Sequence, residues 1–158
     1  MKMSKSDRQE AILRLIKEKD IETQEGLVSE LIAAGLSITQ ATVSRDIKDL
    51  GIIKVATPEG NTKYRALNRT GDVAPQRLLY VFSQSIVSCQ NAGNLVIIKT
   101  LPGMAQGAAS ALDSLALNGV IGTIGGDDTV FAATKNEREA EVLAKTIFYI
   151  NDKLNQED

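Results

Sequence analysis

The chain has 158 residues, of which 43% are hydrophobic and 24% charged, a globular composition that excludes wholesale disorder. It contains no histidine, which excludes His-based catalytic triads and most catalytic zinc sites, and one cysteine, Cys89, which excludes an internal disulfide. No apolar run approaches the roughly 18 residues of a membrane span, and the polar start lacks the apolar region of a secretory signal. We therefore expect a cytoplasmic protein with no membrane partner.

The net charge of −2 is unevenly distributed along the chain. Residues 1–70 carry 12 Lys and Arg against 10 Asp and Glu, whereas residues 71–158 carry 6 against 10. Residues 68–75 combine Gly, Asp and Pro without apolar periodicity, which indicates a linker. We therefore expect two domains, 1–67 and 76–158, with different partners.

The first domain has the pattern of three helices followed by a β-hairpin. Ser6 and Gln9 form a capping box, which predicts that the first helix runs over 6–19. Hydroxyl residues and glycines mark the other helix ends, and Pro and Gly mark the hairpin turn. The remaining expected elements are helices between Thr23 and Gly35 and between Thr39 and Gly51, and strands over 52–56 and 62–66.

The third helix of this domain has one apolar side and one polar side when it is drawn at about 100° per residue. Ala41 on the polar side would let the helix approach another molecule closely, and Ser44 can donate to a phosphate or a base edge. Arg45 can form two hydrogen bonds to guanine, and Lys48 can neutralise phosphate. The pattern predicts a winged helix-turn-helix that reads double-stranded DNA; a helical bundle that only exposes a polar face is the alternative.

The second domain alternates helices with pairs of strands. We expect helices over 76–83, 106–117 and 137–154 and strands over 86–90, 95–100, 120–124 and 129–133. This order indicates an α+β domain with helices on one face of an antiparallel sheet. The domain is small and apolar, and such domains often bury their surplus surface against copies of themselves. Cys89 falls in an expected strand without a basic neighbour, which favours a buried, inert thiol.

Two motifs resemble those of bacterial arginine repressors. TQATVSRDIKDLG at 39–51 is similar to the recognition helix of that family, and GTIGGDDT at 122–129 is similar to its second signature. LPGMAQ at 101–106 and DSL at 113–115 also match, in the order of the family. The resemblance implies a winged-helix domain followed by an α/β domain for oligomerisation and ligand binding. It also implies a hexamer of two trimers, with L-arginine as corepressor at the interface between the trimers.

The resemblance also implies roles for individual residues. Gly125 stands where the family often has alanine, and because both are small we expect unchanged ligand chemistry and at most a looser hairpin. The DNA contacts of the family match Gln40, Ser44 and Arg45, and its arginine contacts match Gln106, Asp113, Asp127 and Asp128.

Asp127 and Asp128 lie in the expected turn between the last two strands. Aspartate is a common turn residue, so the pair could serve the turn alone. Adjacent carboxylates repel each other, however, and a guanidinium group matches their planar geometry and cancels the repulsion. L-arginine would then act as a counterion shared between subunits, with Gln106 and Asp113 meeting its α-ammonium or carboxylate group.

The resemblance therefore implies an L-arginine-dependent transcriptional regulator that binds palindromic operators as a hexamer. It would repress arginine biosynthesis genes, and activation of arginine catabolism is left open. One alternative is an architectural DNA-binding accessory protein. Another is an enzyme, which the lack of histidine and of a nucleophile–base pair disfavours. We expect no catalytic residues and no cofactor. We also expect no metal site, because the two adjacent aspartates lack the third clustered acid that a Mg²⁺ or Ca²⁺ site would need.

Overall fold

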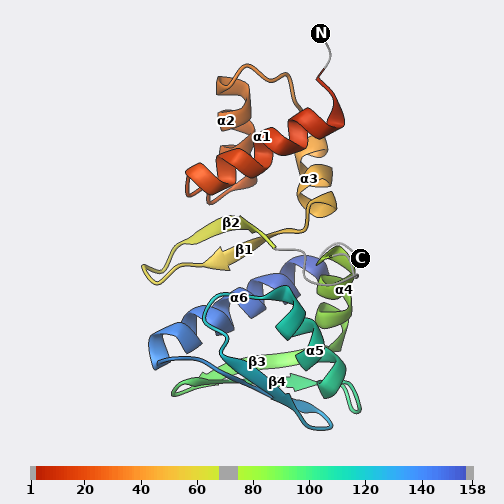
Figure 1. Ribbon diagram of the computed structural model, residues 1–158, viewed down its shortest axis with the longest axis vertical. Helices are drawn as coiled ribbons and strands as arrows, with labels where there is room; N and C mark the ends of the chain where they lie inside the picture. Colours follow the sequence, from red (N-terminus) through yellow and green to blue (C-terminus); the bar gives the residue numbers. More distant parts are fainter. Residues whose placement is uncertain (1–2, 68–74, 156–158) are drawn as a thin grey trace.

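The computed structural model describes residues 3–67 and 75–155, which form two stacked domains (Figure 1). The N-terminal domain has three helices and a two-stranded antiparallel hairpin, in which the second and third helices form a helix-turn-helix. The hairpin lies beside the C-terminal domain, in the position of a wing. The elements are α1 (Lys5–Glu18), α2 (Gln24–Ala33), α3 (Gln40–Asp49), β1 (Ile52–Ala56) and β2 (Thr62–Ala66).

Hydroxyl side chains set the starts of these helices. Thr23 accepts a hydrogen bond from the Gly26 amide at 3.0 Å, as the sequence predicted. The expected cap at Ser6 is wrong, because Ser4 caps α1 by accepting from the Asp7 amide at 3.1 Å. Ser4 also donates to the Asp7 carboxylate, and an acid in the first turn suits the helix dipole. The Gln9 side chain does not cap α1 but donates a hydrogen bond to Asp46 of α3.

Apolar residues from α1, α2, α3 and the wing form the N-terminal core. Helix spacing brings Ile12 of α1 and Leu27 of α2 against Val43 of α3. Tyr64 of β2 closes this core and is 3% exposed, so the aromatic ring of the wing packs inward and does not face solvent. The core therefore fixes α3 with one side buried and the other side open.

The C-terminal domain places three helices on one face of a four-stranded antiparallel sheet of order β3-β4-β6-β5. In Figure 1 these helices lie between the sheet and the N-terminal domain. Pro75, the end of the expected linker, begins the first helix; the rest of the linker, 68–74, lies outside the described residues. The elements are α4 (Pro75–Ser85), β3 (Ile86–Ala92), β4 (Leu95–Thr100), α5 (Ala105–Leu115), β5 (Gly122–Gly125), β6 (Thr129–Ala133) and α6 (Glu137–Asn155).

The strand β5 begins two residues later than the sequence predicted, and α5 ends two residues earlier. Ala116 has a left-handed backbone, with φ of 49°, and Gly119 has φ of 90°. A left-handed residue ends a helix, so the chain turns twice before it enters the sheet.

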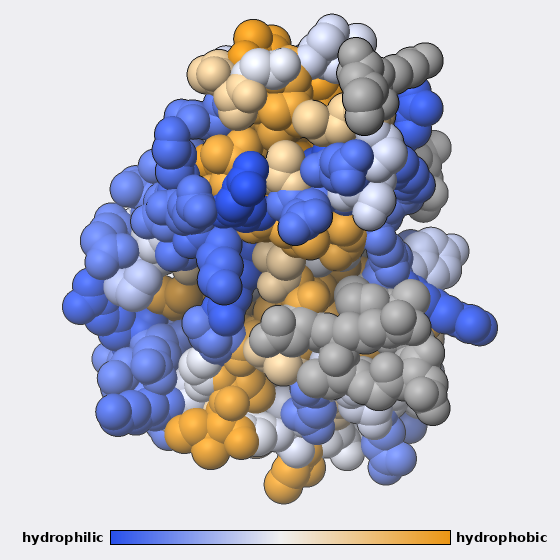
Figure 2. Space-filling model, turned by 45° about the horizontal axis from the view of Figure 1, so that its top comes forward, coloured by the Kyte–Doolittle hydropathy of each residue, from blue (hydrophilic) through white to orange (hydrophobic). Residues whose placement is uncertain are grey.

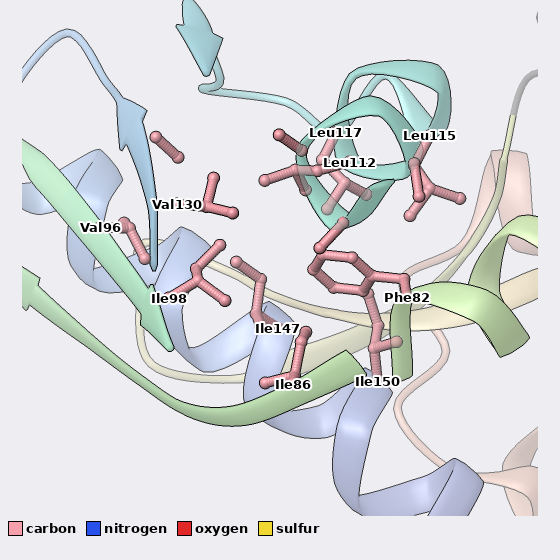
Figure 3. Packing of buried hydrophobic residues seen from close by; sticks show 14 of the residues in the cluster. Phe82, Ile86, Val96, Ile98, Leu112, Leu115, Leu117, Val130, Ile147 and Ile150 are labelled. Carbon is pink, nitrogen blue, oxygen red and sulfur yellow. The ribbon is translucent and has the colours of Figure 1, made fainter. Parts of the chain in front are cut away.

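The two faces of the sheet differ in what covers them. Val96, Ile98 and Val130 face the helices, where Figure 3 shows them opposite Ile147 of α6, while Phe82 of α4 points toward Leu112 of α5. On the other face, Ile124 and Phe131 are paired across β5 and β6 and are 78% and 49% exposed. Figure 2 shows hydrophobic side chains protruding at the lower edge of the molecule, on the C-terminal domain.

The wing strand β1 packs against α6 and joins the two domains. The Ala56 amide donates to the Thr146 hydroxyl at 3.1 Å in a buried contact, and Ile53 packs in the core of the C-terminal domain. Arg138 at the start of α6 donates to the Pro58 carbonyl in the wing turn at 3.3 Å. The wing is therefore supported from both sides.

Candidate functional site

The polar side of α3 faces solvent. Arg45 is exposed, and no hydrogen bond or ion pair engages its guanidinium group among residues 3–67 and 75–155. Gln40, at the first position of the helix, donates to Glu25 of α2 at 3.3 Å. The structure places all five expected DNA-contacting residues on the first three turns of α3. Gln40, Ala41, Arg45 and Lys48 are exposed and Ser44 is half-buried.

The inner side of α3 is held by a charged contact that the sequence analysis missed. The Asp46 carboxylate, 2% exposed, accepts hydrogen bonds from Arg8 of α1 at 2.5 and 3.0 Å. Gln9 adds a third at 3.1 Å. Burial alone would raise the pKa of Asp46, but the hydrogen bonds from Arg8 and Gln9 outweigh it and lower the pKa. The sequence carried one signal for this contact: Asp46 lies only about 60° from the apolar Val43 on the helical wheel.

The basic residues of the wing are partly engaged within the domain. Lys54 lies over the Tyr64 ring, 5.7 Å from its centroid. Lys63 pairs with Asp20 at 3.2 Å, and both side chains are exposed. Exposed ion pairs contribute little free energy, so this pair leaves Lys63 able to exchange Asp20 for a phosphate.

The turn between β5 and β6 carries the two adjacent aspartates at the protein surface. Their main chains fix the turn: the Ala105 amide donates to the Asp127 carbonyl at 3.1 Å, and the Thr100 amide donates to the Asp128 carbonyl at 2.8 Å. Met104 provides no side-chain cap for α5, so the Asp127 carbonyl accepts from the first amide of that helix. The two carboxylates take no part in these main-chain bonds.

The two carboxylates differ in their surroundings. Asp128 accepts a hydrogen bond from Thr129 at 2.8 Å, and Lys99 Nζ lies 3.7 Å from its Oδ1. The Thr129 hydrogen bond and the Lys99 charge lower the pKa of Asp128. Within the described part of the chain, no hydrogen bond or ion pair involves the Asp127 carboxylate. Asp127 and Asp128 can therefore bind a cation in addition to Lys99.

The other two expected ligand-contacting residues lie on the exposed stripe of α5. Gln106 follows the residue that bonds to the hairpin, and Asp113 lies two turns further along the helix. The Asp113 carboxylate accepts from Thr123 of β5 at 2.9 Å. The structure therefore brings Gln106, Asp113, Asp127 and Asp128 to one edge of the domain, on open surface.

Gly125, for which the sequence predicted at most a looser hairpin, lies where the hairpin approaches α5 closely. A Cβ atom at this position would lie 2.8 Å from the Ala105 carbonyl oxygen and 2.9 Å from Gln106 Cα, so a side chain would require the main chain to shift. The glycine thus allows the hairpin to approach α5 closely.

The remaining chemistry of the described chain is limited. Burial raises the pKa of Cys89 to about 12, so the thiol stays protonated at neutral pH and is a poor nucleophile. In the ranges 3–67 and 75–155, no group of three or more Cys, Asp and Glu could hold a metal ion. No helix in the same ranges has the length and apolar character to cross a bilayer.

Comparisons with known proteins agree with this geometry. Residues 3–72 match the family model described as "Arginine repressor, DNA binding domain", and residues 82–148 match "Arginine repressor, C-terminal domain". The arginine repressor of Caldicellulosiruptor bescii is 52% identical over 143 residues, which cover 90% of this chain and 94% of that protein. The arginine repressor of Clostridium botulinum is 45% identical over 148 residues, 93% of this chain and 99% of the relative.

Proposed function

Because this chain belongs to the arginine repressor family, we propose that it represses arginine biosynthesis genes in response to L-arginine. It is a DNA-binding transcriptional regulator and not an enzyme. The observation that carries the arginine response is the exposed Asp127–Asp128 pair, which the main chain holds beside Gln106 on α5.

We assign DNA reading to α3, inserted in the major groove. Arg45 would form two hydrogen bonds to a guanine, and Ser44 would bond to a neighbouring base edge or phosphate. Ala41 would allow close approach, while Gln40 and Lys48 would contact the flanking DNA. The support is that these residues share one side of α3 while Asp46 secures the other.

L-arginine would bind at the acidic hairpin. Its guanidinium group would lie against Asp127 and Asp128, since two planar carboxylates match two pairs of N–H donors. Gln106 and Asp113 would bind the α-ammonium and α-carboxylate groups of the ligand. The open position of this site on the domain supports a ligand that is shared with a second subunit.

The assembly would be a hexamer of two trimers. The exposed sheet residues Ile124 and Phe131, paired across β5 and β6, form an apolar surface that an oligomer would bury. Hairpins from several subunits would repel one another until L-arginine neutralises them. A ligand that binds only the assembled state stabilises it by about 2.7 kcal/mol per site at about 100 times its Kd. The hexamer would then place several α3 helices on paired operator half-sites at once.

The test is the variant Asp128→Asn, measured by gel shift on a palindromic arginine-gene operator with and without L-arginine. We expect it to lose the L-arginine-dependent gain in DNA affinity and to keep the weak basal binding. Sedimentation with and without L-arginine should show the matching loss of ligand-driven assembly. An unchanged arginine response in Asp128→Asn would contradict the site.

Arg45→Ala is the reciprocal control. It should bind L-arginine as the wild type does in calorimetry, yet lose operator discrimination worth about 1–3 kcal/mol. If the wild type bound DNA equally well with and without L-arginine, an architectural role would replace the proposed one.

A further inference from the structure

We propose that Thr146 on α6 is a positioning residue for DNA recognition: by holding the wing, it fixes the angle between α3 and the C-terminal domain, and thereby the half-site spacing that the assembly accepts. The inference rests on the proposed function, because spacing matters only where one assembly presents several α3 helices to DNA. It concerns a residue outside those that are expected to touch DNA or L-arginine.

Strand β1 of the wing turns one of its main-chain amides toward α6. Successive amides on an antiparallel hairpin point alternately toward the partner strand and away from it. Because the Thr57 amide donates to the Asn61 carbonyl inside the hairpin, the neighbouring amide of Ala56 points outward from β1. The Ala56 amide therefore needs an acceptor outside the hairpin, and the Thr146 hydroxyl provides it at 3.1 Å.

Strand β2 is anchored to the N-terminal domain in the same way. The Tyr64 amide donates at 2.9 Å to the carbonyl of Ile21, which lies between α1 and α2. Both residues belong to the core that also holds Val43 of α3. In Figure 1 the wing lies between the N-terminal helices and α6. The wing is therefore a bridge, with β2 bonded to the domain of α3 and β1 bonded to the C-terminal domain.

The Thr146 hydroxyl has a fixed role in this bridge, and the residue is 4% exposed. The hydroxyl donates its one hydrogen to the Val142 carbonyl at 2.9 Å, so toward the Ala56 amide it can only accept. Ala56 is itself 8% exposed. Without the Thr146 oxygen its amide would be buried without an acceptor, which is costly, and release of the wing to water would relieve that cost.

The hydrogen bond gives the bridge a direction that its apolar contact lacks. Ile53 of β1 packs in the C-terminal core, but apolar burial is non-directional and tolerates rotation of the wing. A hydrogen bond weakens steeply when its angle becomes unfavourable. We therefore assign the angle between the domains to the Thr146 bond, and the attraction between them to Ile53.

This angle decides which DNA sites the assembly can bind. One base pair inserted between two half-sites moves the second half-site by about 3.4 Å and rotates it by about 35° around the DNA axis. An α3 helix on a fixed wing cannot follow this displacement, whereas a wing released from α6 would let α3 follow part of it. The wild type should therefore discriminate steeply between spacings.

The experiment compares full-length wild type, Thr146→Val and Thr146→Ser at saturating L-arginine, with DNA affinity measured by fluorescence anisotropy. The duplexes are a palindromic arginine-gene operator, the same operator with two base pairs inserted between its half-sites, and a single half-site. Valine keeps the branched shape without the oxygen acceptor, and serine keeps the acceptor, so Thr146→Ser is the matched control.

The quantity compared is the spacing ratio, which is the Kd for the operator with the insertion divided by the Kd for the intact operator. In Thr146→Val we expect this ratio to fall at least about fivefold below that of the wild type. In Thr146→Ser it should stay within about twofold of the wild type. All three proteins should bind the single half-site equally, because α3 itself is unchanged.

Each outcome decides the question. If Thr146→Val keeps the ratio of the wild type, or Thr146→Ser loses it equally, the inference is overturned while the proposed function stands. Loss of single half-site binding in Thr146→Val also overturns it, because Thr146 would then only support folding. The wild type alone gives a check that does not depend on any variant: equal affinities for the two spacings overturn the inference. If the wild type gains no affinity from L-arginine, the proposed function fails and the inference with it.

Discussion

The helix α3, to which we assign DNA reading, and the acidic hairpin are held in place by different kinds of contact. Side chains hold α3: Asp46 forms hydrogen bonds with Arg8 and Gln9 on α1. The main chain holds the hairpin, through the carbonyls of Asp127 and Asp128. One functional surface is therefore sensitive to single substitutions in its support, whereas the carboxylates of the other can be changed without disturbing their own scaffold.

This difference fits the tasks that we propose for the two surfaces. A helix that reads base edges needs a fixed orientation, which the buried contact at Asp46 provides. A ligand site needs carboxylates that are not already used for folding. Substitutions in each support should therefore change stability by different amounts.

The largest effect is expected for Arg8→Ala. This variant leaves the Asp46 carboxylate, 2% exposed, without its guanidinium partner, which is itself 21% exposed. Removing one partner of a buried pair leaves an uncompensated charge, and we expect a loss of about 2–3 kcal/mol in the free energy of unfolding. Urea denaturation followed by circular dichroism measures this loss.

The matched control for Arg8→Ala is Lys5→Ala, on the same helix. Lys5 pairs with Asp49 of α3, but these side chains are 63% and 49% exposed. An exposed pair should cost less than about 1 kcal/mol when it is removed. Equal losses of unfolding free energy in the two variants would show that the buried Arg8–Asp46 contact stabilises the domain no more than the exposed Lys5–Asp49 pair does.

An intermediate effect is expected from pH. The lowered pKa of Asp46 means that the unfolded chain binds this proton more readily than the folded one. The contribution of Asp46 is therefore fully present above the unfolded pKa of about 3.9 and is lost as pH falls through the lower folded value. Urea midpoints of wild type and Asp46→Asn, compared from pH 7 to pH 3, should converge toward acid. A difference that stays constant with pH would argue against the ionised contact.

The smallest effect is expected for the double variant Asp127→Asn with Asp128→Asn. Without L-arginine its free energy of unfolding should stay within about 0.5 kcal/mol of wild type, because main-chain bonds hold the turn. Thermal melting in ligand-free buffer measures this. A loss comparable to that of Arg8→Ala would mean that the carboxylates are part of the scaffold after all.

The sequence was sufficient where the signal was local. The caps at Thr23 and Thr39 and the wing strands 52–56 and 62–66 follow from residues a few positions apart, and all are confirmed. The predicted cap of the first helix was wrong because the sequence contains two capping patterns, Ser4 with Asp7 and Ser6 with Gln9. Both patterns satisfy the same rule, and the structure uses the first. Local patterns therefore predict that a helix forms more reliably than they predict the residues at which it begins and ends.

Contacts between distant segments could not be predicted from the sequence. Arg8 and Asp46 are 38 residues apart, and nothing near either residue identifies its partner. Gly125 lies 20 positions from Ala105, and its small size alone predicted only a looser turn. The four expected arginine-binding residues came from family resemblance, and the packing of α5 against β5 and the turn, which brings them together, could be seen only in the folded chain.

The docking of β1 on α6 has a consequence for how the chain can be divided. Neighbouring residues of this strand serve different halves of the molecule: Ile52 packs in the N-terminal core and Ile53 in the C-terminal core. Side chains on a strand alternate between its two sides, so β1 contributes one side to each of the two hydrophobic cores. A cut after the wing would leave Ile53 facing water, and an excised winged-helix fragment would lack part of the support that its wing has in the intact protein.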